Sequence, residues 1–235
     1  MGWTEGFIAA DWGTTNRRAY RIGPGGRPEA EFEDDAGILS VAEGAFPASV
    51  AQIRQRLGDK PLLLAGMVGS NRGWVEAPYV PCPAGLEDVA AGLAWPEEGR
   101  TAIVPGVSYL RGDDADVMRG EEVQMLGALA AGDVPPGALV CHPGTHNKWA
   151  RLEAGRIARF TTVMTGELFN LLKEHSILAA TISGPVESGP AFAAGVRRGL
   201  AGGSLGAEAR EHVRCAAESW TGVEGLVRAL CFAGS

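Results

Sequence analysis

The residues with the clearest capacity for chemistry lie in a short polar turn near the start of the sequence. An apolar run begins at Phe7 and ends in the carboxylate Asp11, and the polar stretch Gly13-Thr14-Thr15-Asn16 follows. Glycine permits backbone angles that other residues resist, and successive N–H groups aimed into a concavity bind anions such as phosphate. A carboxylate beside such a turn suits hydrated Mg²⁺, which takes one or two carboxylates and phosphate oxygens. We therefore predict a strand–turn–strand unit that holds phosphate and metal, with an ordinary hairpin turn as the alternative.

A second stretch, residues 138–152, repeats this pattern far along the chain. An apolar strand runs into Gly144-Thr145-His146-Asn147, and a second strand follows from Lys148 onward. His142 occupies the position of Asp11, so only the first turn offers a carboxylate to a metal. The pair of turns resembles the phosphate-1 and phosphate-2 loops of the actin, hexokinase and sugar-kinase superfamily. Two such turns predict two similar lobes that face a common cleft.

A pair of carboxylates opens a predicted helix before the second turn. Apolar residues recur with helical spacing over residues 123–131, and Glu121 and Glu122 precede them. Acidic residues at a helix start complement the helix dipole, which is the structural alternative. Sugar kinases of the superfamily often carry their base carboxylate at such a helix start. Either Glu121 or Glu122 is therefore a candidate for accepting the proton of a substrate hydroxyl, and the sequence does not choose between them.

The candidate substrate site follows a short apolar strand over residues 60–66. This strand ends in a glycine-rich turn, and ligands approach such strand ends in open α/β sheets. The polar and aromatic loop 71–79 comes next, with Arg72 as a candidate partner for a substrate carboxylate and a solvated surface loop as the alternative. The substrate-binding candidates are Asn16, Arg18, Gly66, Met67, Gly69, Ser70, Arg72 and Trp74.

The candidate nucleotide site combines both turns with a third helix start. Thr165 is a predicted N-cap, and a helix N-terminus favours anions, although a cap without a ligand is the alternative. Arg18 or Lys148 could offset charge on a transferred phosphoryl group, and His146 is either a phosphate ligand or a structural histidine. The nucleotide-binding candidates are Gly13, Thr14, Thr15, Gly144, Thr145, His146, Lys148, Thr165 and Gly166.

The elements that must position these residues alternate between strands and helices, which predicts an α/β fold. The predicted strands cover residues 7–22 as a hairpin, then 28–34, 60–66, 100–105, the hairpin around 138–152, and 155–160. The predicted helices cover 45–57, 86–93, 123–131 and a segment from 165. Weaker helical patterns cover 191–200 and 208–220, with a flexible turn at 202–206 between them. Within 45–57, one helical stripe carries Phe46, Val50, Ile53 and Leu57.

Composition narrows the class of partner. The chain has 235 residues and a net charge of −7, with Lys and Arg scattered along it, which argues against nucleic acid or an anionic membrane as the partner. Apolar runs are too short to span a bilayer, so we expect a cytoplasmic protein. Four cysteines without CxxC spacing predict neither a zinc site nor a disulfide framework. The sequence leaves a homo-oligomer open.

Motifs along the chain occur in the order typical of one bacterial kinase family. They are Asp11-Trp12-Gly13-Thr14-Thr15-Asn16, Gly66-Met67-Val68-Gly69-Ser70 with Gly73-Trp74, Tyr79-Val80-Pro81-Cys82-Pro83, Val117-Met118-Arg119-Gly120-Glu121-Glu122, Pro143-Gly144-Thr145-His146-Asn147-Lys148-Trp149 and Met164-Thr165-Gly166-Glu167. Over about residues 7–178 the chain resembles the 2-dehydro-3-deoxygalactonokinase family.

This resemblance implies a two-lobed actin-like, ribonuclease H-like α/β fold, with lobes at residues 1–112 and 113–235. It also implies ATP and Mg²⁺ as cofactors and phosphorylation of the 6-hydroxyl of 2-dehydro-3-deoxy-D-galactonate in galactonate catabolism. The family's distal glycine-rich adenosine motif is not found here, with residues 199–206 a poor match. We therefore expect a second lobe that is truncated or divergent at its C-terminus.

Two other functions compete with a kinase. A catalytically impaired sugar-acid-binding protein of the same fold would lack a complete adenosine site. A hydrolase would use Cys141 or Ser70 as its nucleophile with His142, His146 or His175, but the sequence has no nucleophile-elbow spacing. The sequence does not separate the galacto from the gluco stereoisomer of the substrate.

Overall fold

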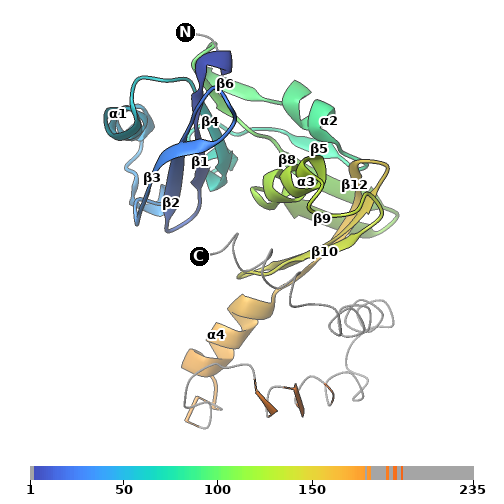
Figure 1. The fold of residues 1–235 in the computed structure, drawn as a ribbon. Coiled ribbons are helices and arrows are strands. Elements are labelled where there is room, and N and C mark those ends of the chain that lie inside the picture. The colour runs from blue at the N-terminus through green and yellow to red at the C-terminus, as the bar shows by residue number, and fades with distance from the viewer. Residues whose placement is uncertain (1–2, 178, 181–188, 191–192, 195–196, 198–235) are drawn as a thin grey trace. The chain divides into compact units, whose positions relative to one another are not determined.

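The computed structural model describes residues 3–177, 179–180, 189–190, 193–194 and 197, and it contains a six-stranded sheet. Its order is β3-β2-β1-β4-β7-β6 (Figure 1). The pairs β1–β4 and β4–β7 are parallel, whereas β1–β2, β2–β3 and β6–β7 are antiparallel. The strands are β1 (Phe7–Trp12), β2 (Arg17–Ile22), β3 (Pro28–Asp34), β4 (Leu62–Gly66), β6 (Ala94–Glu97) and β7 (Thr101–Ile103).

Helix α1 (Phe46–Leu57) packs on one face of this sheet. Its buried residues form the stripe that helical spacing predicts: Phe46, Val50, Ile53 and Leu57. They join a first core with residues of β1, β2, β4 and β7, namely Ile8, Ala10, Trp12, Ala19, Leu62, Leu64 and Ile103. Successive side chains of a strand point to opposite faces, so Leu62 and Leu64 belong to this core.

The opposite face of β4 contributes Leu63 and Ala65 to a second core. This core includes α2 (Leu86–Ala91) through Val89 and α3 (Glu121–Ala131) through Met125 and Leu126. Because α3 is packed through these buried side chains, its first residues are held against the end of β4. This packing matters for function, since α3 begins with the two candidate base carboxylates.

Smaller sheets complete the described structure. The strands β5 (Tyr79–Pro81), β8 (Gly106–Arg111) and β9 (Asp114–Met118) form one sheet in the order β5-β8-β9. The strands β10 (Leu139–His142), β11 (Asn147–Glu153) and β12 (Arg156–Val163) form another in the order β10-β11-β12. Helix α4 (Thr165–His175) follows, and the short 3-10 helices are η1 (Trp3–Glu5), η2 (Ile38–Ser40) and η3 (Met67–Gly69).

The chain divides into two compact units. The first comprises residues 1–140 and 150–162, and the second comprises 141–149 with the chain from Val163 onward. These units do not divide at residue 112, because β9 and α3 belong with the first unit. Compact units are not the same as the lobes of a kinase fold, so the two expected lobes, 1–112 and 113–235, stay a prediction.

Most predicted elements agree with the structure. The first hairpin, β3, α1, β4, α2, α3, β10, β11, β12 and α4 lie where periodicity places them, whereas the expected strand 100–105 covers only Thr101–Ile103. Strands β5, β6, β8 and β9 were not predicted; β9 begins in an acidic stretch, and Asp is disfavoured in strands. The predicted segments 202–206 and 208–220 lie outside the described residues, as does most of 191–200. No helix in the described part of the chain is long and apolar enough to cross a membrane.

Candidate functional site

The first predicted turn, residues 13–16, connects β1 to β2. The Gly13 N–H donates to the Asn16 carbonyl oxygen at 2.9 Å and closes the turn. The carbonyl oxygens of residues 13–15 accept hydrogen bonds from the N–H groups of residues 37–39 at 2.9–3.2 Å. Among the described residues, the N–H groups of Thr14 and Thr15 have no acceptor, and both residues are exposed. This side of the turn can therefore bind an anion.

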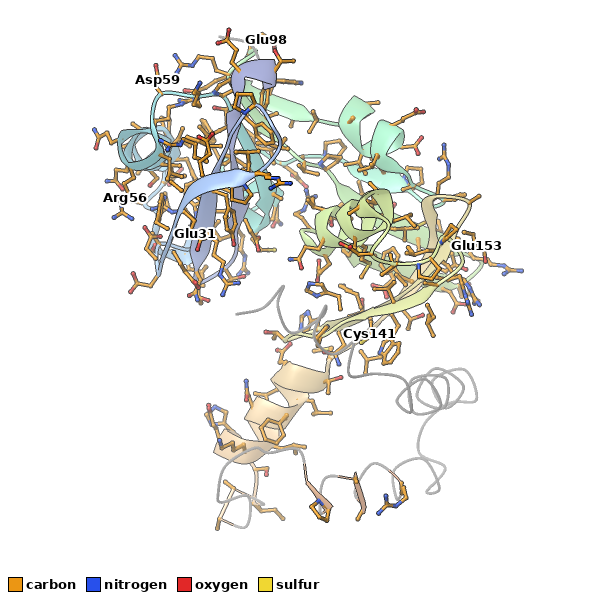
Figure 2. The ribbon with its side chains drawn as sticks, in the orientation of Figure 1. Glu31, Arg56, Asp59, Glu98, Cys141 and Glu153 are labelled. Carbon is orange, nitrogen blue, oxygen red and sulfur yellow. The ribbon has the colours of Figure 1, made fainter. Side chains whose placement is uncertain are left out.

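A buried ion pair anchors the base of this hairpin. The Arg17 side chain is only 2% exposed, and its Nη2 lies 2.9 Å from Asp34 Oδ2 at the end of β3. Its guanidinium also lies 4.9 Å from the Trp12 ring centroid. Arg56, which extends from α1 (Figure 2), reaches the same Asp34 oxygen with its Nη1 at 2.9 Å. Neither Arg17 nor Asp34 stood out in the sequence, because their pairing depends on the register of β2 and β3.

Asp11 lies at the carboxyl end of β1, next to the end of β4. Asp11 is paired in register with Ala65, and Trp12 with Gly66. Gly66 has a φ of +91°, and a Cβ added there would lie 3.1 Å from Asp11 Oδ1. The carboxylate is therefore seated directly beside the Gly66 backbone, at the parallel strand ends where ligands approach in α/β sheets. Asp11 is exposed, so its carboxylate is accessible to a metal ion.

The start of α3 lies against the same point. Gly120 has a φ of +113°, and a Cβ added there would lie 3.2 Å from the Gly66 Cα. The Gly120 N–H donates to both Glu122 carboxylate oxygens, at 2.9 and 2.7 Å. The Arg119 N–H donates to Glu121 Oε2 at 3.1 Å. The predicted metal carboxylate, Asp11, and the helix start that carries Glu121 and Glu122 therefore both lie beside Gly66.

The two neighbouring glutamates differ in environment. Glu122 is 0% exposed, and burial raises the pKa of its carboxyl to about 8. Hydrogen bonds from its own N–H and that of Gly120 oppose this rise, the charge of Glu121 adds to it, and the charge of Arg119 reduces it. Glu121 is partly exposed. Sequence spacing could not separate the two because burial is a tertiary property.

Arg119 connects the candidate substrate loop to α3. Its Nη2 donates to the Ala77 carbonyl oxygen at 2.8 Å, and its guanidinium lies 4.3 Å from the Tyr79 ring centroid. The Ala77 N–H in turn donates to the Gly69 carbonyl oxygen at 2.9 Å. Arg119 was not among the predicted site residues, although it belongs to the motif at residues 117–122 that carries the family resemblance.

The predicted substrate-binding residues occupy varied environments. Ser70 is buried, and its hydroxyl donates to the Met67 carbonyl oxygen at 2.7 Å, which closes η3. Trp74 stacks on Phe46 with ring centroids 6.5 Å apart, so its ring packs against the first core. Asn16 and Arg72 are exposed, Gly69 packs against Ile103, and Arg18 forms an ion pair with Glu33 at 3.0 Å. A substrate role for these residues stays a prediction.

The second turn belongs to the second unit. The Gly144 N–H donates to Asn147 Oδ1 at 2.9 Å, and the Glu167 N–H donates to the Thr145 carbonyl oxygen at 3.0 Å. His146 Nε2 lies 2.5 Å from Glu167 Oε2. The first turn of α4 is thus packed on this turn. Lys148, on β11, is buried.

The N-cap prediction for α4 was wrong by one residue. The N-cap is Met164, and Thr165 is the first helical residue. The Thr165 hydroxyl donates instead to the Val163 carbonyl oxygen at 3.4 Å. Gly166 lies close to the backbone of the second turn, since a Cβ added at Gly166 would lie 2.6 Å from the Gly144 carbonyl oxygen. The start of α4 therefore lies against the second turn.

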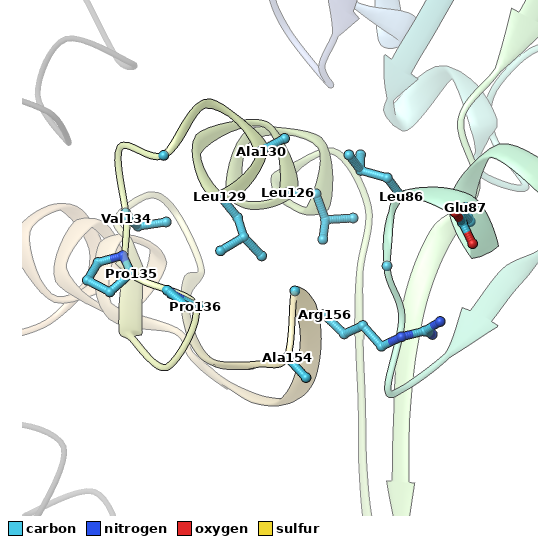
Figure 3. A pocket seen from close by; sticks show the side chains of 13 residues that line it. Leu86, Glu87, Leu126, Leu129, Ala130, Val134, Pro135, Pro136, Ala154 and Arg156 are labelled. Atoms are coloured by element: carbon cyan, nitrogen blue, oxygen red, sulfur yellow. The ribbon is translucent and has the colours of Figure 1, made fainter.

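A cavity of about 600 Å³ lies along the C-terminal half of α3 (Figure 3). Its walls are largely apolar, with Glu87 and Arg156 as the charged side chains among the residues that line it: Gly85, Leu86, Glu87, Leu126, Leu129, Ala130, Gly132, Val134, Pro135, Pro136, Ala154, Gly155 and Arg156. None of the candidate site residues lines it. We assign no catalytic role to this cavity, because it does not contain the carboxylates and N–H groups described above.

Comparisons of the sequence with known proteins identify its relatives. The model of the 2-keto-3-deoxy-galactonokinase family matches residues 11–213. The 2-dehydro-3-deoxygalactonokinase of Escherichia coli (strain K12) is 40% identical over 200 residues, which cover 84% of this chain and 66% of that protein. A Rhizobium meliloti (strain 1021) protein named "Probable 2-dehydro-3-deoxygalactonokinase" is 40% identical over 188 residues, which cover 77% of this chain and 60% of that protein.

A solved structure is similar over most of its length. The crystal structure of a Sinorhizobium meliloti protein, described as a candidate 2-dehydro-3-deoxygalactonokinase, superposes with a TM-score of 0.73 at 32% identity. The match covers 97% of this chain and 80% of that one. The fold is therefore of the actin-like α/β class that includes sugar kinases.

Within that class, the family match extends over most of the sequence. The chain belongs to the 2-keto-3-deoxy-galactonokinase family. It spans 66% and 60% of the length of the two curated relatives described above.

Proposed function

We propose that this chain is an ATP-dependent kinase that phosphorylates the 6-hydroxyl group of 2-dehydro-3-deoxy-D-galactonate. The observation that carries the proposal is the meeting of Asp11, Gly66 and the start of α3, beside a turn whose Thr14 and Thr15 N–H groups have no acceptor among the described residues. The names of the 40% identical relatives support the same reaction. No feature of the described residues favours a binding protein without turnover.

The donor set at Asp11 fits a hydrated Mg²⁺. Mg²⁺ takes one or two carboxylates with phosphate oxygens and keeps several waters, so a single exposed carboxylate suffices. When bound, the ion would neutralise charge on the phosphate oxygens. Asp11 would hold it, and the exposure of this carboxylate leaves room for its water shell.

The first turn would bind the phosphates through the N–H groups of Thr14 and Thr15. The second turn, with Gly144 and Thr145, and the buried cation Lys148 would supply further donors. Phosphoryl transfer needs positioning and charge neutralisation more than covalent help from the protein.

Glu121 would be the general base. A base must lie within hydrogen-bond reach of the hydroxyl whose proton it accepts, and Glu121 is the more exposed of the two glutamates. It would accept the proton of the 6-hydroxyl at a carboxylate oxygen. Glu122 is fully buried and accepts a hydrogen bond from the Gly120 N–H, so it would hold the start of α3 in place.

The test is a coupled ADP-release assay with Mg-ATP and the sugar acid, comparing wild type with Asp11→Asn, Glu121→Gln and Glu122→Gln. We expect Mg²⁺-dependent ADP release that Asp11→Asn and Glu121→Gln each lower by about 10²- to 10⁴-fold. A wild type without sugar-dependent ADP release would refute the proposed reaction. If Glu122→Gln lost more turnover than Glu121→Gln, the two glutamates would exchange roles.

Separate calorimetric titrations with ATP and the sugar acid test the rival function. Binding of both ligands is expected. Binding of the sugar acid without any binding of ATP would support the sugar-acid-binding protein instead.

A further inference from the structure

We propose that residues 36–39, named here the brace, form the positioning element of the triphosphate site, and that Gly37 is its positioning residue. The inference rests on the proposed function, because it assigns the brace to the nucleotide. It adds a segment that lies outside both phosphate turns. The brace lies between β3 and α1, and η2 begins within it.

The hydrogen bonds of the brace orient the first turn. The carbonyl oxygens of residues 13, 14 and 15 accept from the N–H groups of Ile38, Leu39 and Gly37 at 3.0, 3.2 and 2.9 Å. In a planar trans peptide the C=O and the following N–H point in opposite directions. Binding three successive carbonyls on one side therefore turns the N–H groups of residues 14–16 to the other side. Three donors aimed the same way suit phosphate oxygens.

Only glycine fits at position 37. A Cβ added there would lie 2.3 Å from the Thr15 carbonyl carbon, 2.4 Å from the Thr14 carbonyl oxygen and 2.4 Å from the Thr15 Cα. These are backbone atoms of the turn, which cannot rotate away as a flexible side chain would. Gly37 itself has φ −64° and ψ 171°, angles that alanine adopts without strain. The requirement for glycine is thus one of space, and a substitution must displace the turn.

The brace is fixed to the rest of the first unit at each end. The indole Nε1 of Trp12, which is fully buried, donates to the Ala36 carbonyl oxygen at 2.8 Å. The Ser40 hydroxyl and the Ser40 N–H both donate to the Gly37 carbonyl oxygen, at 2.8 and 3.0 Å. The turn is therefore held in its binding geometry before a ligand arrives, which lowers the ordering cost of binding.

The Ile38 side chain of the brace shares the first core with Val68 and Ala77 of residues 67–79, the candidate sugar-acid segment. The three atoms nearest to a Cβ at Gly37 all belong to Thr14 and Thr15, so a substitution there acts first on the nucleotide turn. Displacing it should weaken the binding of ATP and leave the binding of the sugar acid unchanged. A general loss of stability would weaken both. This difference separates a positioning role from a purely structural one.

The experiment measures the Kd of Mg-ATP and of 2-dehydro-3-deoxygalactonate separately by calorimetry, with thermal unfolding of each protein alongside. The variants are Gly37→Ala and the milder Ser40→Ala, which removes one hydroxyl from an exposed side chain. The control is Gly25→Ala, since a Cβ at Gly25 meets nothing within 4 Å. We expect the ATP Kd to rise about ten- to hundredfold in Gly37→Ala and about two- to fivefold in Ser40→Ala. The control and all sugar-acid Kd values should match wild type.

Each outcome decides the proposal. A folded Gly37→Ala with the ATP affinity of wild type overturns it, and so does an equal loss of affinity for both ligands. If Gly37→Ala does not fold, Ser40→Ala decides, and an unchanged ATP Kd in that variant overturns the proposal. A wild type that binds no ATP refutes the proposed function itself, whereas ATP binding that ignores both brace substitutions refutes only the role of the brace.

Discussion

The buried carboxyl of Glu122 makes the stability of the fold depend on pH. Its pKa is about 8 in the folded protein against an ordinary value of 4.5. Below about pH 4.5 the carboxyl is neutral in both folded and unfolded chains, so its ionisation has no effect on the free energy of unfolding. Between pH 4.5 and 8 the unfolded chain releases this proton while the folded chain retains it, so stability falls as pH rises. Above about pH 8 the loss stays constant.

The structure sets the size of this effect. A separation of about three and a half pKa units, at 1.36 kcal/mol per unit, corresponds to roughly 5 kcal/mol. Full burial means that water does not screen the charge. Glu122→Gln keeps the shape of the side chain and an oxygen for the Gly120 N–H, but it cannot ionise. We therefore expect the variant to resemble wild type near pH 4.5 and to be several kcal/mol more stable at pH 8.5.

The assay is urea unfolding at half-unit steps from pH 4.5 to 8.5, with the free energy in water obtained by linear extrapolation. Glu121→Gln is the matched control, because it removes the same charge from a partly exposed neighbour. The difference between Glu122→Gln and wild type should grow with pH, and that for the control should stay small. A Glu122→Gln difference that does not change with pH would refute the reasoning.

Three further substitutions test how the site is built. Gly66→Ala places a Cβ 2.9 Å from the Trp12 carbonyl oxygen and 3.1 Å from Asp11 Oδ1, at a residue whose φ is +91°. We therefore expect it to lower the free energy of unfolding by roughly 1–3 kcal/mol and the rate of ADP release by more than tenfold. Gly127→Ala, in α3 where a Cβ meets nothing within 4 Å, is its control and should be neutral or stabilising in urea unfolding. Arg17→Met removes the buried partner of Asp34 and should lower the free energy of unfolding by about 3 kcal/mol. A loss below about 0.5 kcal/mol would mean that Arg56 alone satisfies the Asp34 carboxylate. Arg119→Lys keeps the positive charge but loses the guanidinium group that reaches the Ala77 carbonyl oxygen. The KM for the sugar acid should then rise about fivefold or more, while the ATP Kd stays unchanged. An unchanged KM would contradict the coupling of the candidate substrate loop to α3.

The sequence predicted those parts of the fold that are local in character. Short apolar runs that end in polar or glycine-rich turns predicted β1 and β4, and helical spacing predicted the buried stripe of α1. Asp11 and Gly66 could be found because each comes directly at the end of an apolar strand. Their proximity follows from the parallel pairing of β1 with β4, which the sequence itself does not contain.

The brace could not be predicted, and the reason is physical. Gly37 contacts residues that lie more than twenty positions earlier, and its own sequence, Ala36-Gly37-Ile38-Leu39, has no motif that predicts a partner. Its φ is ordinary, so even a search for unusual backbone angles would pass over it. The choice between Glu121 and Glu122 failed for a related reason, since only packing of α3 decides which carboxyl is buried.

Close backbone contacts at three glycines hold the parts of the candidate site together. Gly37 meets the backbone of the first turn, Gly66 meets Asp11, and Gly120 meets Gly66. In each case the absence of a side chain lets two elements touch, so the position of a chemical group is fixed by backbone atoms with little freedom to move. The substrate loop is held instead by the long side chain of Arg119. We therefore expect substitutions at the glycines to reduce turnover or ATP binding, and substitutions at Arg119 to act through the sugar-acid KM.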